Sequence, residues 1–208
     1  MMTLNICLRQ GITDLGLEIS ASSQAKLICF IELIQKWNRT FNLTAIRQRE
    51  EMVSHHLLDS LSIANYVSGP HILDIGSGAG LPGIPLAISL PQYQFVLLDS
   101  QGKKTRFLLQ VKNELDLPNV EIVQERVEHY QPGELFNEIT ARAFGSVHDI
   151  ISLSKHLLLP KGQWLLMRGQ VMEEELSGIK GTAEIVPLKV PGLNKQRSLV
   201  LIRKFAFY

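Results

Sequence analysis

The sequence predicts a doubly wound α/β fold, in which a mainly parallel β-sheet ends in an antiparallel hairpin and follows an N-terminal helical appendage. Three observations predict it. From residue 71 onward, short apolar runs alternate with helical patterns, which is typical of βαβ units. A glycine-rich turn follows the first run. The last two runs are separated only by residues 191–197, which are too few for a parallel crossover and therefore predict an antiparallel pair.

The helical appendage is expected over residues 1–66 and the α/β core over residues 67–208. Two apolar stripes with the spacing of one helix face predict two helices between residues 20 and 66. The stripes are Leu27, Phe30, Ile31 and Ile34, and then Val53, Leu57, Leu61 and Ala64. In the polar turn between them, Trp37 and Phe41 can stack on nucleic-acid bases, but packing within the appendage is the favoured interpretation.

The core is expected to contain strands at 72–75, 95–98, 120–123, 139–141, 163–167, 183–190 and 199–205. Helices are expected at 83–90, 103–115, 147–158 and 172–177. A parallel sheet that finishes in an antiparallel hairpin is the arrangement of class I (Rossmann-like) methyltransferases, whereas a plain dinucleotide-binding domain usually lacks the hairpin.

Composition limits the class of protein. The chain has 208 residues, of which 45% are apolar, which fits one core or one domain with a small appendage. The net charge is +1, so any RNA contact must come from a local patch. Cys7 and Cys29 lack metal-ligand spacing, and no metal is expected. Neither a signal-peptide pattern nor an apolar run of about 20 residues is present, so we expect a cytoplasmic protein without a membrane partner, and a monomer.

The glycine-rich turn reads Asp74-Ile75-Gly76-Ser77-Gly78-Ala79-Gly80 and joins the first strand to a helix. Glycine permits a positive φ and leaves no Cβ between backbone and ligand, and such a turn lies where ligands bind in open α/β sheets. Residues 78–83 also fit the dinucleotide pattern G-x-G-x-x-G. Asp74 favours a methyltransferase, because a carboxylate there can bind the cationic methionine part of S-adenosylmethionine or order the turn, and would repel a pyrophosphate. A purely structural turn remains the alternative.

Asp99 ends the second strand. A carboxylate at this strand tip can accept hydrogen bonds from both ribose hydroxyls of a bound nucleoside. Nicotinamide cofactors are held in the same way, so Asp99 indicates a nucleoside-bearing cofactor without choosing which. The alternative is an ordinary helix N-cap.

The kind of methylation is narrowed by what the sequence lacks. Carbon-5 methylation of cytosine needs a cysteine near the cofactor, and both cysteines precede the cofactor domain. Exocyclic-amine methylation commonly uses Asn/Asp-Pro-Pro-aromatic after the fourth strand, where this chain has residues 140–144, Thr-Ala-Arg-Ala-Phe. Oxygen targets, protein or small-molecule amines and ring nitrogens remain. Nitrogen 7 of guanine has the smallest catalytic requirement, since it carries no proton and the enzyme needs only to position it.

The assembled motifs resemble the bacterial 16S ribosomal RNA guanine-N(7) methyltransferase family, also known as glucose-inhibited division protein B. The resemblance covers roughly residues 30–205. It rests on an ordered set of motifs: Trp37-Asn38, Asn42-Leu43-Thr44-Ala45-Ile46, His56-Leu57-Leu58-Asp59-Ser60, the turn from Asp74 to Ala87, Leu97-Leu98-Asp99-Ser100 with Lys103, Arg126-Val127-Glu128, Arg142-Ala143-Phe144 and Gly169-Gln170.

This resemblance implies methylation of one guanine in the 530 loop of 16S rRNA, presented in the small ribosomal subunit or its precursor, with S-adenosylmethionine as donor. Family donor contacts carry over onto Gly76, Leu81, Val127, Glu128 and Arg142. Asp74, Gly78, Gly80 and Asp99 complete the expected donor site. Two positions depart from the pattern: Thr140 replaces a serine and Arg168 replaces a lysine, which is not equivalent at a close contact.

Several cationic residues are expected to contact RNA: Arg39, Arg47, Lys103, Lys104, Arg106, Arg168 and Arg197. The three at 103–106 open a helix, where the dipole disfavours cations, so their clustering indicates phosphate contacts, with a solvated face as the alternative. Arg142 is expected to reach the donor carboxylate or the RNA, unless it forms a surface ion pair. His56 is expected to position the target nucleotide, or simply to pair with Asp59 on the same helix.

Other functions stay open at the level of sequence. The chain also fits a class I methyltransferase acting on a small molecule or protein, or a module that binds S-adenosylmethionine without catalysis. A nicotinamide-dependent oxidoreductase is the remaining alternative, because the glycine turn also fits a dinucleotide pattern.

Overall fold

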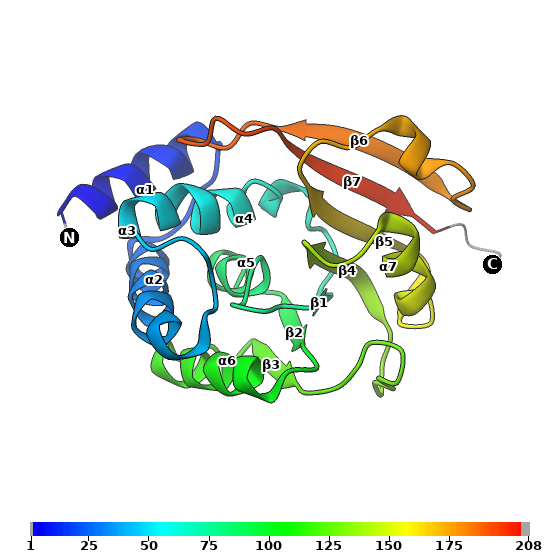
Figure 1. Cartoon of the computed structure of the whole chain (residues 1–208), viewed down its shortest axis with the longest axis horizontal. Coiled ribbons are helices and arrows are strands. Elements are labelled where there is room, and N and C mark those ends of the chain that lie inside the picture. Colours follow the sequence, from blue (N-terminus) through cyan, green and yellow to red (C-terminus); the bar gives the residue numbers. More distant parts are fainter. Residues whose placement is uncertain (1, 205–208) are drawn as a thin grey trace.

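The computed structural model describes residues 2–204, and these contain a seven-stranded sheet in the order β3-β2-β1-β4-β5-β7-β6 (Figure 1). The strands are β1 (His71–Ile75), β2 (Gln94–Leu98), β3 (Val120–Val123), β4 (Phe136–Arg142), β5 (Leu158–Arg168), β6 (Thr182–Leu188) and β7 (Arg197–Arg203). Strands β1 to β5 are parallel, whereas β7 lies antiparallel to both β5 and β6. The predicted parallel sheet with a terminal antiparallel pair is therefore confirmed.

The helical elements before the sheet are α1 (Met2–Asp14), α2 (Ala21–Phe41), α3 (Arg49–Met52), η1 (Val53–Leu58), α4 (Asp59–Leu61) and η2 (Ala64–Tyr66). Those within the core are α5 (Gly83–Ser89), α6 (Gly102–Glu114), α7 (Val147–Ser154) and η3 (Glu173–Leu176). Elements α3, η1 and α4 form one continuous helix over 49–61, whose middle part, η1, is π-helical.

Some expected boundaries are wrong. The helix expected at 147–158 ends at Ser154, because β5 begins at Leu158 rather than at 163. The segment expected as a helix at 172–177 is only the short 3₁₀ turn η3. The strand expected at 199–205 ends at Arg203, and Phe205 lies outside the described residues.

Helix α1 was not expected, although its sequence carries a signal for it. Leu4, Leu8 and Ile12 recur every four residues and are all buried. They face the helix over 49–61, where a Cβ added at Gly11 would overlap the Leu58 side chain.

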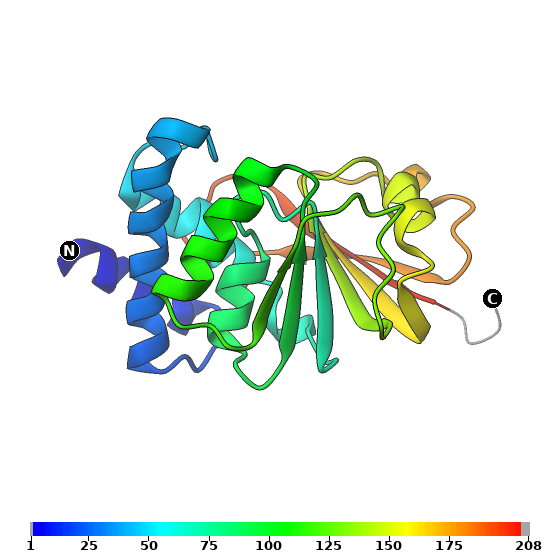
Figure 2. The same ribbon diagram turned by 90° about the horizontal axis from the view of Figure 1, so that it is seen from below.

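The sheet separates two apolar cores. Alternate residues of β1 point to opposite faces, so Ile72 joins one core and Leu73 the other. The first core is shared with α1, α2, α5, α6 and the helix over 49–61, and the second with α7 (Figure 2). The N-terminal helices therefore pack on the sheet through one continuous core.

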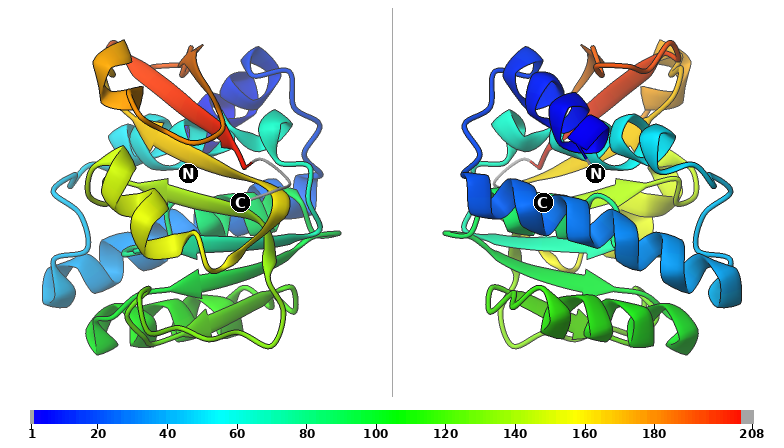
Figure 3. Two further views of the ribbon diagram at one scale, coloured as in Figure 1. Left: turned by 90° about the vertical axis from the view of Figure 1, so that its right-hand side faces the viewer. Right: turned by 90° about the vertical axis from the view of Figure 1, so that its left-hand side faces the viewer.

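The connection between β6 and β7 also contacts the N-terminal helices. Val190 and Leu193 pack in the first core, and Gly192 lies so close to Ser54 that a Cβ would overlap its hydroxyl. Figure 3 shows this connection running beside α1. Within residues 2–204, no helix is both long and apolar enough to cross a bilayer.

Candidate active site at the carboxyl ends of the parallel strands

The glycine turn between β1 and α5 adopts a conformation that its sequence requires. Gly76, Gly78 and Gly80 all have positive φ, at 64°, 58° and 83°. A Cβ at Gly76 would overlap the Phe144 ring, and a Cβ at Gly80 would lie 2.6 Å from Ile84 Cγ1. Gly76 lines a cavity, whereas Leu81 is buried in the first core. The turn thus places its first glycine at the cavity wall and packs its last one against helices.

Asp74 is fully buried beneath this turn. Its Oδ2 accepts a hydrogen bond from the Gly83 N–H at 3.2 Å, and its Oδ1 accepts one from the Thr140 hydroxyl at 3.1 Å. Burial raises the pKa of the Asp74 carboxyl to about 7, and hydrogen bonds to Asp74 oppose the rise. Of the two roles considered for Asp74, ordering of the turn is the one whose contacts are present. Thr140, where a serine was expected, supplies the same hydroxyl donor.

The first cavity has a volume of about 400 Å³ and lies between the tips of β1, β2 and β3. Asp99 forms part of its wall, with Oδ2 accepting from the Gly78 N–H at 3.0 Å and Oδ1 from the Gln101 N–H at 2.9 Å. These two bonds hold a buried carboxylate in a fixed orientation at the second strand tip. Val127 and Glu128, which follow β3, line the same cavity. The structure thus brings three predicted donor contacts, Asp99, Val127 and Glu128, to the wall of one cavity.

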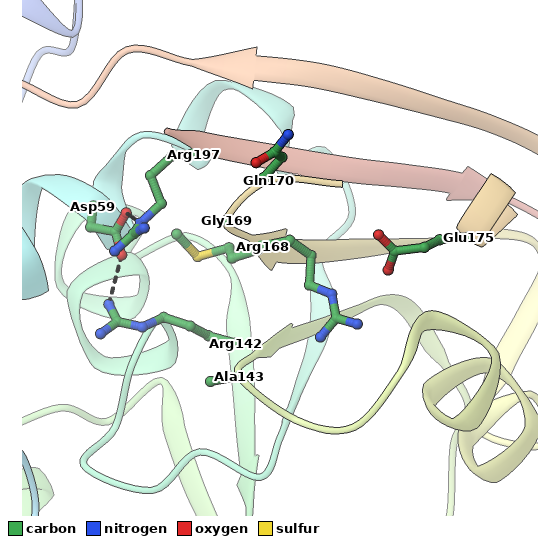
Figure 4. A pocket seen from close by; sticks show the side chains of 9 residues that line it. Asp59, Arg142, Ala143, Arg168, Gly169, Gln170, Glu175 and Arg197 are labelled. Atoms are coloured by element: carbon green, nitrogen blue, oxygen red, sulfur yellow. Dashed lines mark hydrogen bonds and ion pairs between the residues drawn. The ribbon is translucent and has the colours of Figure 1, made fainter. Parts of the chain in front are cut away.

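Figure 4 shows the residues that line a second cavity, which has a volume of about 480 Å³. Ala143, which has a φ of 54°, lines both cavities. Three arginines from three different strands line the second one, namely Arg142 at the end of β4, Arg168 at the end of β5 and Arg197 at the start of β7. The two lining carboxylates are Asp59 and Glu175, so the wall carries a positive excess.

Asp59 binds two of these arginines at once. Its Oδ2 lies 2.9 Å from Arg142 Nη1 and its Oδ1 lies 2.9 Å from Arg197 Nε, while only 2% of the side chain is exposed. Burial lowers the pKa of the Arg142 guanidinium, and the charge of Asp59 opposes that effect. The sequence motifs included Asp59, but nothing local in the chain indicated these partners.

The expected pairing of His56 with Asp59 is wrong, because Asp59 is occupied by the arginines. His56 Nε2 instead lies 3.0 Å from the Thr44 hydroxyl. Burial, followed by the charge of Arg142, lowers the pKa of the imidazole to about 4, so it is neutral at physiological pH. His56 is buried and lines neither cavity.

The cations expected to contact RNA fall into two groups. Arg39, Arg47, Lys103 and Arg106 are exposed, at the end of α2, in the segment after it and at the start of α6. The remaining three line the cavities: Lys104 lies 3.6 Å from Asp99 Oδ2 in the first, and Arg168 and Arg197 belong to the second. Arg168 Nη1 also donates to the Gly145 carbonyl oxygen.

The aromatic residues of α2 serve packing. Trp37 stacks on Phe41, with ring centroids 5.1 Å apart, and contacts Phe107 of α6 at 6.1 Å. The packing interpretation is therefore confirmed. These contacts join the last part of α2 to the middle of α6, on the same side of the sheet (Figure 2).

Sheet topology, glycine turn and strand-tip carboxylate are together those of a class I methyltransferase. A sequence model of the rRNA small subunit methyltransferase G family (GidB) matches residues 23–200. The chain belongs to this family.

Curated relatives agree over most of the chain. A ribosomal RNA small subunit methyltransferase G from Coxiella burnetii is 50% identical over 196 residues, covering 94% of this chain and 96% of its own length. The protein of the same name from Nitrosococcus oceani is 50% identical, with 94% of this chain and 93% of its own length covered.

Solved structures show the same fold at low sequence identity. A putative S-adenosyl-L-methionine-dependent methyltransferase from Methanococcus maripaludis superposes with a TM-score of 0.57 at 15% identity, covering 84% of this chain and 92% of that one. The YcgJ protein from Bacillus subtilis superposes with a TM-score of 0.58 at 14% identity, covering 72% and 99%. These similarities confirm the predicted fold class.

Proposed function

We propose that this protein transfers the methyl group of S-adenosylmethionine to nitrogen 7 of a guanine in the 530 loop of 16S rRNA. Family membership supports a ribosomal RNA substrate, since the curated relatives are named as methyltransferases of the small-subunit rRNA. The cationic wall of the second cavity, beside the donor cavity, fits the phosphates of an RNA substrate.

The observation that carries the proposal is that the described residues lining the second cavity offer no proton acceptor that is both buried and unpaired. Within residues 2–204, its lining contains no histidine and two carboxylates. Asp59 is bound by two guanidinium groups, and Glu175 is exposed and accepts the Met172 N–H at 3.0 Å. Guanine nitrogen 7 carries a lone pair and no proton, so its methylation needs no general base. Orientation against the sulfonium methyl group is sufficient.

For the donor, we assign the ribose hydroxyls to Asp99 and the adenine side of the cavity to Val127 and Glu128. Gly76 lets the backbone approach the donor, while Gly78 holds Asp99 through its N–H. Asp74, Gly80 and Leu81 act indirectly, by keeping the turn in shape.

For the RNA, Arg168 and Arg197 provide phosphate contacts inside the second cavity, and Arg142 serves the donor carboxylate or the RNA. The exposed cations Arg39, Arg47, Lys103 and Arg106 extend the positive surface along the same edge of the molecule, with Lys104 facing the donor cavity. His56 contributes only through its neighbours Thr44 and Arg142.

Incubation with methyl-labelled donor tests the proposal. The acceptors are 30S particles and naked 16S rRNA from cells that lack this activity, and the labelled nucleotide is then mapped. We expect label only at one guanine of the 530 loop, as 7-methylguanine. Label in ribosomal proteins or in small molecules would support another acceptor class. Donor binding in calorimetry without transfer to any acceptor would indicate a binding module.

A further inference from the structure

We propose that Asp59 is a positioning residue for methyl transfer, which fixes the guanidinium groups of Arg142 and Arg197 so that both point oriented N–H donors at one anionic group. This inference rests on the proposed function, because it concerns how donor and RNA meet in the second cavity. Figure 4 shows the Asp59 carboxylate between the two guanidinium groups.

The three residues come from three distant parts of the chain. Asp59 begins α4, Arg142 ends β4 and Arg197 begins β7. Each carboxylate oxygen takes one arginine, at 2.9 Å in both cases. The side chains of Arg142 and Arg197 are only 22% and 23% exposed, so solvent competes weakly with these bonds. Asp59 therefore holds the end of the central sheet and the start of the hairpin strand at a fixed separation.

The π-helical segment η1 explains how one helical turn accepts two hydrogen bonds from the Arg142 guanidinium. The Asp59 N–H donates to the Ser54 carbonyl oxygen, five residues back. An ordinary α-helix would pair that N–H with the His55 carbonyl oxygen, four residues back. In this protein the His55 oxygen accepts from Arg142 Nη1 at 3.1 Å. Backbone and side chain of the same turn thus hold the guanidinium, and π-helical turns of this kind are frequent at functional sites.

Stability alone does not account for the arrangement. A buried ion pair gains little over apolar groups of similar volume, because removing the charges from water costs about as much as their attraction returns. Orientation is what such a cluster provides. Within the described residues, Arg142 Nη2 and Arg197 Nη2 make no hydrogen bond, and the three charges sum to +1. The free donors and the surplus charge fit anionic oxygens, from either the donor carboxylate or a phosphate of the RNA.

The substitution Asp59→Asn tests the assignment, because it keeps the shape of the side chain and removes its charge. We expect kcat/KM for methylation of 30S particles to fall about 100-fold, as for other misplacements of a positioning group. Ser60→Ala is the matched control, since Ser60 is equally buried on the same helix and its hydroxyl contacts neither arginine. Its kcat/KM should stay within about twofold of the wild type. Wild-type kcat/KM in Asp59→Asn would overturn the proposal.

Two measurements on Asp59→Asn identify the anion. A weaker donor affinity in calorimetry would assign the guanidinium groups to the donor carboxylate. A raised KM for 30S particles with unchanged donor affinity would assign them to an RNA phosphate. Either result supports a positioning role, and a loss of stability with neither change would contradict it.

Arg197→Lys provides a second variant that keeps the charge at a partly exposed position and loses the planar fork of donors. If orientation matters, its activity should fall nearly as far as in Asp59→Asn, and the double variant should be little worse than either single one. Full activity in Arg197→Lys, or full additivity in the double variant, would refute an action of Asp59 through Arg197.

Nitrogen-15 spectra of the arginine side chains separate this inference from the proposed function. In the wild type, rotation of the Arg142 and Arg197 guanidinium groups should be hindered, and in Asp59→Asn their Nη signals should average. Unchanged hindrance in Asp59→Asn would disprove the positioning role. A wild type that leaves 30S particles unmethylated would refute the proposed function alone, while these spectra still decide the role of Asp59.

Discussion

At the scale of single residues, two buried ionisable side chains carry pKa shifts in opposite directions. Burial raises the pKa of Asp74 to about 7 and lowers that of His56 to about 4. Each group is therefore held neutral over a part of the pH range in which the unfolded chain would charge it. Their effects on the free energy of unfolding oppose one another between about pH 4 and pH 7.

Replacing Asp74 should change how stability depends on pH. The folded protein binds the Asp74 proton more tightly than the unfolded chain does. The stabilisation of the fold by this proton is therefore complete below the unfolded pKa of 3.8 and is lost as pH rises through about 7. Asp74→Asn keeps an acceptor for the Gly83 N–H and removes this loss, which amounts to at most about 4 kcal/mol. Urea titrations at pH values from 4 to 8 measure it. Asp14→Asn, at an exposed carboxyl, is the control, and equal pH slopes in all three proteins would contradict the assignment.

His56 should show the reverse dependence. The contribution of His56 to the free energy of unfolding is complete above the unfolded pKa of 6.5. It is lost as pH falls through about 4, because the unfolded chain takes up the proton first. His56→Gln retains a polar group for Thr44 and should abolish this loss of about 3 kcal/mol. The variant should therefore be relatively more stable at pH 5 than at pH 8, compared with the wild type in the same titrations. An identical pH profile would show that the imidazole is not held neutral.

At the scale of elements, two glycines of the turn allow the cost of a positive φ to be compared with the cost of a steric overlap. Gly76 and Gly78 have nearly equal positive φ, but only a Cβ at Gly76 would overlap a side chain, that of Phe144. Around Gly78 the nearest atom is the Gly76 carbonyl oxygen at 3.7 Å. The two positions therefore form a matched pair within one turn.

Alanine at these two glycines should have unequal effects. Gly78→Ala should cost about 1 kcal/mol, from the left-handed conformation alone. Gly76→Ala should cost about 1–3 kcal/mol more and weaken donor binding, because the Phe144 ring must move. Thermal unfolding and donor calorimetry measure both effects, with Gly133→Ala, where nothing lies within 4 Å, as the control. Equal losses at Gly76 and Gly78 would exclude a part for Phe144.

Most elements with strong periodicity could be predicted, with α1 as the exception, and irregular ones could not. The strand cores and helices α2, α5 and α6 follow from apolar spacing and from the glycine turn. The π-helical segment η1 keeps a helical pattern in its sequence, so its wider turn has no local signal. The early start of β5 depends on pairing of Leu158 with Phe136 of β4, which is a partner distant in sequence.

At the scale of the whole molecule, the N-terminal helices and the sheet share one apolar core. Asp59 also connects these helices to β4 and β7 through ion pairs. The helical appendage, which was expected to pack on the core, should therefore unfold together with the sheet.

Leu8→Ala tests this cooperativity. Leu8 is fully buried in α1, so its truncation should cost about 2–5 kcal/mol and shift a single unfolding transition of the entire protein. Ile6→Ala on the same helix is the control, because Ile6 is 60% exposed and should change stability by less than about 0.5 kcal/mol. Separate transitions for helix and sheet signals in Leu8→Ala would show that the appendage folds independently.

The sequence by itself determined the fold class, the succession of strands along the chain, the glycine turn and the carboxylate at the second strand tip. These features depend on neighbours within a few residues, where periodicity and turn chemistry act. Only the tertiary structure decided that Asp59 pairs with Arg142 and Arg197 rather than with His56, since those partners lie 83 and 138 residues away. Sheet order and the π-helical turn bring the three residues together, and no local sequence pattern indicates contacts between residues so far apart in the chain.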